Sequence, residues 1–229
     1  MSGASEGGWN LFCTAHRMGF DFVDFKEMVS YANTPKGIEI MSFYTDLCKQ
    51  YGPPGSANWT WTDIGAAFTQ GKLAMAVGGN ASYAYLEDKT NSKVAGKVGY
   101  APPPMENGKD PLWIWGWAIN ANSKNKEAAW KYMEFLISDP EITKTYYQDT
   151  GLMPTRISLL NDPIYKDDPF VRQVLNQTEY MKKPLGWGPR WGRVGEIVMA
   201  AVQEVVLMGR DVQSALDEAV RQIKIELSM

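Results

Sequence analysis

Long segments with apolar residues at helical spacing alternate with short apolar runs, and this alternation constrains the fold more than any other feature. Apolar residues repeat every three or four positions in residues 194–208 and 212–227, which is typical of amphipathic helices. Gly209 suits the end of the first helix, and Asp211 suits the start of the second. Further helices are predicted over residues 34–52, 62–70, 124–137 and 140–150.

The short runs are bounded by glycine or proline, which is typical of buried strands. We predict strands at 73–79, 97–102 and 113–120, and an irregular region rich in proline and glycine at 152–193. Helices that alternate with short strands predict a mixed α/β fold.

Composition excludes several functional classes. The 229 residues carry a net charge of −3, with 45% apolar and 21% charged residues. This balance is typical of a folded chain and gives no sign of a nucleic-acid binder, which usually has a basic surface. The single histidine, His16, and two cysteines are too few for a structural zinc site, and we expect no metal and no cofactor. Cys13 and Cys48 form either a disulfide or two buried thiols.

Tryptophan is unusually frequent and unevenly placed, with nine in the chain. Trp113, Trp115 and Trp117 would share one face of the strand predicted at 113–120. Trp59, Trp61, Trp187 and Trp191 lie in segments rich in glycine, proline or polar residues, and Trp130 lies on the apolar side of a predicted helix. Core packing remains one interpretation. The alternative is a binding surface, because indole rings present flat apolar faces on which sugar rings stack, while nearby polar groups bind the hydroxyls.

Five motifs, in order, resemble those of the extracellular solute-binding proteins of bacterial ABC sugar importers, family 1. They are Phe68–Met75 (F-x-x-G-K-x-A-M), Val98–Pro104 (V-G-x-x-P-x-P), Trp115–Ile119 followed by Ser123–Ala129 (G-W-x-I then S-K-N-K-E-A-A), Gly151–Arg156 (G-x-x-P-x-R) and Gly209 to Asp217 (G-R then A-L-D). Each motif is weak alone, whereas their common order over most of the chain makes the resemblance fairly specific.

The resemblance implies a periplasmic-binding-protein-like type II fold, in which two α/β lobes joined by a hinge close over a ligand. It also implies a truncated chain: most of the C-terminal lobe plus a helical segment of the N-terminal lobe. Residues 1–112 and 155–229 would form the C-terminal lobe, and 117–150 the segment of the N-terminal lobe. Residues 113–116 and 151–154 would be the hinge crossings.

Eight substrate-binding residues follow from the same resemblance. They are Trp115, Tyr83, Trp9, Asn80, Trp187, Arg190, Trp191 and Arg156. Trp115 matches the tryptophan of the family's cleft, and Tyr83 follows the glycine pair after which relatives often place a stacking aromatic ring. The alternative for each residue is packing within the core.

The resemblance predicts a non-enzymatic protein that captures a sugar or oligosaccharide and delivers it to ABC permease subunits in the membrane. Its location would be periplasmic or extracellular and membrane-anchored, although residues 1–5 do not resemble a signal peptide. A missing lobe would expose apolar surface and favour self-association. The alternative function is a carbohydrate-active hydrolase using an Asp/Glu pair, for which the separation of two carboxylates is decisive.

Overall fold

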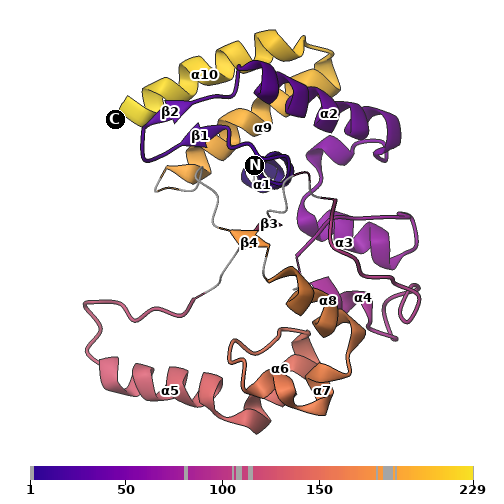
Figure 1. Cartoon of the computed structure of the whole chain (residues 1–229), viewed down its shortest axis with the longest axis vertical. Helices are drawn as coiled ribbons and strands as arrows, with labels where there is room; N and C mark the ends of the chain where they lie inside the picture. The colour runs from indigo at the N-terminus through magenta and orange to yellow at the C-terminus, as the bar shows by residue number, and fades with distance from the viewer. Residues whose placement is uncertain are drawn as a thin grey trace. The chain divides into compact units, whose positions relative to one another are not determined.

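A computed structural model describes most of the chain (Figure 1). The described residues are 3–79, 82–104, 106, 110–112, 116–178, 180–182, 188 and 190–228, and side chains are described from residue 10 onwards. The chain divides into two compact units: unit 1 comprises Met1–Asp63, Pro104–Leu112 and Tyr180–Met229, and unit 2 comprises Ile64–Pro103 and Trp113–Glu179. These units do not coincide with the expected lobes, because 64–103 and 155–179 belong with 117–150. The assignment of each unit to a lobe of the family stays a prediction.

Unit 1 is built from four long helices. They are α1 (Gly3–Arg17), α2 (Pro35–Tyr51), α9 (Trp191–Met208) and α10 (Val212–Ser228). Helix α9 lies against α1, α2 and α10 (Figure 1), and its buried stripe includes Val194, Val198 and Val202. One face of each long helix therefore supplies the core of the unit. A short 3-10 helix, η1 (Ser56–Asn58), packs against α9.

Two small sheets complete unit 1. Strands β1 (Val23–Asp24) and β2 (Val29–Ser30) are antiparallel, and β3 (Asp110–Pro111) pairs in parallel with β4 (Met181–Lys182). Asp110 also accepts a hydrogen bond of 2.6 Å at Oδ1 from Nε of Arg17, and both side chains are nearly buried. This ion pair fixes β3 against the end of α1.

Unit 2 consists of shorter helices. They are α3 (Trp61–Thr69, which begins in unit 1), α4 (Tyr83–Leu86), α5 (Lys126–Ser138), α6 (Pro140–Thr150), η3 (Leu159–Asn161), α7 (Pro163–Lys166) and α8 (Pro169–Gln177). Its core is a small aromatic cluster formed by Tyr147, Tyr165, Phe170 and Val171.

The expected helices are confirmed, and the caps at three helix ends are seen directly. Thr34 accepts a hydrogen bond from the backbone N–H of Gly37 at the start of α2, and Asp211 accepts one from Ser214 at the start of α10. Gly209 ends α9 in the left-handed conformation, with a φ of 69°, which a residue with a side chain adopts only with strain.

The prediction of an irregular region at 152–193 is partly wrong, because two helices lie within it. Asp162 and Asp168 cap α7 and α8, and Pro163 and Pro169 occupy the first helical positions. These Asp-Pro pairs are helix-start signals that the high proline content obscured. Helix α1 was also not expected.

The three predicted strands are not found among the described residues. Residues 73–79, 97–102 and 116–120 form no strand pairs among the described residues, and 113–115 lie outside the described residues. A strand exists only when a neighbour completes its hydrogen bonds, and the described part of the chain offers none. Large apolar side chains on these segments are exposed to solvent: Met75 is 87% exposed and Trp117 is 64% exposed. Trp130 on α5, expected on a packed apolar side, is 57% exposed.

Cys13 and Cys48 are not joined by a disulfide. Cys13 is buried and Cys48 half-buried, which matches the thiol interpretation. Burial raises the pKa of the Cys48 thiol, which lowers its reactivity as a nucleophile.

Candidate functional site

The expected binding residues that the structure describes are divided between the two units. Arg190 and Trp191 lie at the start of α9 in unit 1, whereas Tyr83 and Arg156 lie in unit 2. Asn80, Trp115 and Trp187 lie outside the described residues, as does the side chain of Trp9, whose backbone belongs to α1.

The start of α9 combines an aromatic ring with basic groups. The Trp191 ring meets Phe12 edge-on at a centroid distance of 4.3 Å and is half-buried. Arg193 donates to Glu226 Oε1 at 3.2 Å and to Glu196 Oε2 at 2.9 Å. Arg190 lies 3.9 Å from Glu226 Oε2, a separation too long for a good hydrogen bond. Its guanidinium therefore keeps donor capacity for a further acceptor.

The backbone at this end of α9 is already partly engaged. The carbonyl of Gly188 accepts from the N–H of Trp191, and the carbonyl of Arg190 accepts from the N–H of Val194. The half-buried indole and the partly engaged guanidinium are the groups suited to a neutral, hydroxyl-rich ligand.

Tyr83 in unit 2 is held by a carboxylate. Its hydroxyl donates to Asp168 Oδ2 at 2.9 Å, and the hydroxyl of Tyr147 donates to the same oxygen at 2.8 Å. Asp168 Oδ1 accepts from the N–H of Phe170 at 2.8 Å. The carboxylate therefore satisfies two phenols and caps α8 at once.

The ring of Tyr83 is also engaged. It stacks on Phe170 with a centroid distance of 4.2 Å and an interplanar angle of 11°. Burial, followed by donation to Asp168, raises the pKa of Tyr83 and of Tyr147. In this structure Tyr83 lies within the aromatic core of unit 2, so one ring face and the hydroxyl are already occupied.

Arg156 has a different environment. Its guanidinium is exposed and donates to Ser138 Oγ at 3.0 Å, linking the segment after α6 to the end of α5. Arg190 and Trp191 are neighbours in sequence, and their binding role stays a prediction; sequence reasoning missed Asp168. The Asp168-Pro169 pair signals a helix start, yet nothing in the sequence indicates that two distant tyrosines share this carboxylate.

The described residues contain no group of three or more metal-ligating side chains close enough to hold an ion. Within the same part of the chain, no helix is long and apolar enough to cross a membrane.

Comparison with known proteins identifies the family. The family of bacterial extracellular solute-binding proteins matches residues 4–142. The chain belongs to this family. The match covers more than half of the chain and confirms the resemblance seen in the motifs.

Relatives extend the match beyond residue 142. A mannitol-binding protein from Pseudomonas aeruginosa is 37% identical over 92 residues, covering 39% of this chain and 21% of that protein. A maltotriose-binding protein from Pyrococcus abyssi is 27% identical over 200 residues, covering 84% of this chain and 42% of that protein.

A solved ABC transporter solute-binding protein from Agrobacterium radiobacter K84, in complex with ribitol, shares the fold with a TM-score of 0.85 at 27% identity. The match covers 96% of this chain and 56% of that structure. The α/β fold expected from the sequence is therefore confirmed. The matches span between 21% and 56% of the length of these three relatives.

Proposed function

We propose that this chain is part of the substrate-binding component of an ABC importer that captures a sugar or sugar alcohol for delivery to a membrane permease. The observation that carries this proposal is the combination of the family match over residues 4–142 with the fold shared with a ribitol complex. The chemistry at the start of α9 supports the same ligand class.

The ligand class is narrowed by what the relatives bind. The mannitol-binding protein and the ribitol complex concern linear sugar alcohols, and the maltotriose-binding protein concerns an oligosaccharide. These ligands are neutral and rich in hydroxyl groups, so they need hydrogen-bond partners and apolar contact surfaces rather than opposite charge. We propose a polyol or a short saccharide as the substrate.

Arg190 and Trp191 are the binding residues with the strongest support. Arg190 has donor capacity left beside Glu226, and the indole of Trp191 is half-buried on Phe12. Asn80, Trp115, Trp187, Trp9 and Arg156 remain proposed contacts on the strength of the motifs. Tyr83, whose ring contacts Phe170, Tyr147 and Tyr100, acts by fixing α4 through Asp168.

The proposed component is not an enzyme, acts outside the cytoplasmic membrane and is anchored there or free in the periplasm. Its ligand lies between two lobes that close about a hinge. Apolar side chains exposed on unit 2, Met75 and Phe135 among them, favour self-association of this chain whenever the rest of the fold is absent.

Tryptophan fluorescence tests the binding proposal. The chain, joined to or mixed with the remaining part of the fold, is titrated with ribitol, mannitol and maltotriose. We expect a saturable change with at least one of them. Arg190→Ala should weaken that affinity about tenfold or more, as expected for loss of a hydrogen bond from a charged donor.

The control variant is Lys49→Ala, whose side chain is exposed in the last turn of α2. It should leave the affinity unchanged. Release of reducing ends from a polysaccharide, without a saturable fluorescence change, would contradict the proposal and favour a hydrolase.

A further inference from the structure

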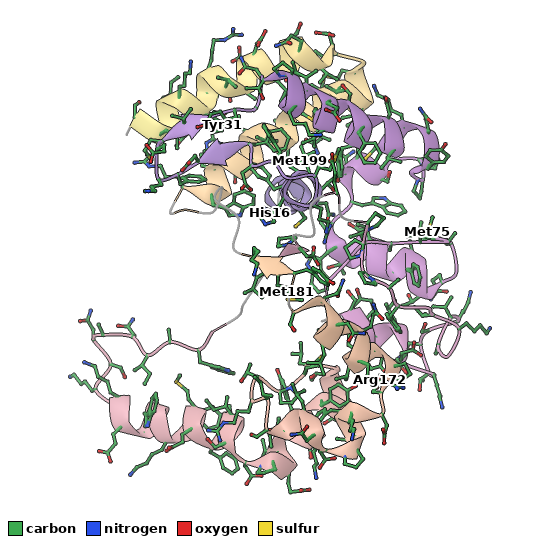
Figure 2. All side chains as sticks on the ribbon, viewed as in Figure 1. His16, Tyr31, Met75, Arg172, Met181 and Met199 are labelled. Atoms are coloured by element: carbon green, nitrogen blue, oxygen red, sulfur yellow. The ribbon has the colours of Figure 1, made fainter. Side chains whose placement is uncertain are left out.

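Glu226 is a carboxylate beside the start of α9 to which the proposed function gives no binding role. It lies in the last turn of α10, which packs along α9 within unit 1 (Figure 1). Core side chains such as Met199, which is 5% exposed and is labelled in Figure 2, fix the orientation of α9. The side chain of Glu226 is 22% exposed, so the carboxylate is partly withdrawn from water while it still reaches the surface.

The two oxygens of Glu226 have different surroundings. Oε1 accepts a hydrogen bond from Nε of Arg193 at 3.2 Å. Oε2 lies 3.9 Å from Nη1 of Arg190, and the described residues place no hydrogen bond on Oε2. Arg193 therefore orients the carboxylate and leaves its second oxygen beside the partly engaged guanidinium of Arg190.

This pair combines a donor with an acceptor. A guanidinium group only donates hydrogen bonds, and a carboxylate only accepts them. A hydroxyl group uses both, because its oxygen accepts from the guanidinium while its proton is donated to the carboxylate. Since the two groups are 3.9 Å apart, one hydroxyl or two vicinal hydroxyls can lie within about 2.7–3.2 Å of both.

The charges around this pair are balanced. Two guanidinium groups, those of Arg190 and Arg193, lie against two carboxylates, those of Glu196 and Glu226. A ligand carboxylate attracted by Arg190 would meet the negative charge of Glu226, and a ligand ammonium attracted by Glu226 would meet Arg190. Like charges brought together in this way disfavour binding, so the pair favours a neutral ligand.

We propose that Glu226 is a substrate-binding residue that determines specificity. With Arg190 it forms a donor–acceptor pair that binds vicinal hydroxyls of a neutral polyol and disfavours the corresponding aldonic acid. The inference rests on the proposed function and names the substrate class of that site. It also gives Arg193 the part of a positioning residue, because Arg193 holds Oε1 and leaves Oε2 for the ligand.

Isothermal titration calorimetry with paired ligands tests the inference. The pairs are mannitol with mannonate and ribitol with ribonate, in which a terminal carboxylate replaces one hydroxymethyl group. The protein is the chain joined to or mixed with the remaining part of the fold. We expect it to bind at least one of the polyols about tenfold or more tightly than the matching aldonate. Glu226→Gln should lower this affinity ratio about tenfold or more, because it removes the negative charge that the aldonate meets.

Glu196→Gln is the matched control. It makes the same change of charge in the same group of side chains, but Glu196 pairs with Arg193 and not with Arg190 among the described residues. The affinity ratio should therefore stay unchanged. Glu226→Asp is a second variant, which keeps the charge but shortens the side chain. It should weaken polyol binding while the aldonate remains disfavoured, and circular dichroism checks that the helices of each variant are intact.

The outcomes separate this inference from the proposed function. An unchanged ratio in Glu226→Gln, or an equal fall in Glu196→Gln, would overturn the inference and leave the proposed function standing. So would tighter binding of an aldonate than of its polyol by the unmodified protein, or binding of a saccharide but of neither polyol. If the unmodified protein binds no polyol and no saccharide, the proposed function fails and the inference fails with it.

Discussion

Asp168 is the residue on which the local order of unit 2 depends most. Its carboxylate accepts two phenol hydroxyls and one backbone N–H, from Tyr83, Tyr147 and Phe170. The three partners belong to α4, α6 and α8. A single side chain therefore connects three helices that are distant in sequence.

Asp168→Ala should destabilise the chain by about 2–3 kcal/mol, because it removes a helix cap and leaves two half-buried hydroxyls without their acceptor. Urea unfolding followed by circular dichroism measures the loss. The matched control is Asp167→Asn at the neighbouring exposed position, which should change stability by less than about 0.5 kcal/mol. Equal effects of the two substitutions would contradict this role of Asp168.

The tyrosines of this cluster predict a loss of stability at alkaline pH. Burial, and then donation to Asp168 or Glu87, raise the pKa of Tyr83, Tyr147 and Tyr100 in the folded chain. Because the folded pKa exceeds the unfolded value, the stabilisation is complete below about pH 10 and is lost as the pH rises through the folded pKa.

Ultraviolet absorbance of the phenolate checks this prediction. In the native chain at least three of the 11 tyrosines should ionise late, together with unfolding of unit 2. In concentrated urea all should ionise around pH 10. Identical titration curves in the two conditions would show that the cluster does not protect its hydroxyls.

At the level of elements, the helices with long apolar stripes were predictable, whereas α1, α7 and α8 were missed and the predicted strands were not found among the described residues. The helices at 34–52 and 194–208 carry their own stripes and caps, such as Thr34 and Gly209, so local sequence determines them. The run at 73–79 has the composition of a strand, but a strand also needs a neighbour, which local sequence does not reveal. The role of Asp168 escaped prediction for the same reason, because its partners are distant in sequence.

Gly209 provides a test of whether the local sequence determines where α9 ends. Gly209→Ala should cost about 1 kcal/mol, because φ is 69° and no neighbouring atom lies near an added Cβ, so the cost comes from the backbone alone. Gly192→Ala, inside the same helix and equally unobstructed, should be neutral or stabilising by up to about 1 kcal/mol. Thermal unfolding compares the stability of the two variants. Destabilisation by both would contradict the assignment of the Gly209 effect to its left-handed backbone conformation.

At the level of the whole molecule, the resemblance in sequence predicted the family and the fold, whereas the binding residues remain divided between two units. Arg190 and Trp191 share the start of α9 in unit 1, and Tyr83 belongs to the core of unit 2. The tryptophans that suggested sugar binding include Trp115 and Trp187, which lie outside the described residues. A ligand-binding measurement is what tests whether these residues contribute to one binding site.

The most direct measurement is isothermal titration calorimetry with ribitol and mannitol on the chain alone and on the chain complemented by the remaining part of the fold. Because the proposed ligand would take contacts from two lobes, the chain alone should bind weakly or not at all. The complemented chain should bind at least one of the two saturably, at one site. Submicromolar binding by the chain alone would contradict the account. A stable complemented protein that binds neither these polyols nor any saccharide tested would also contradict it.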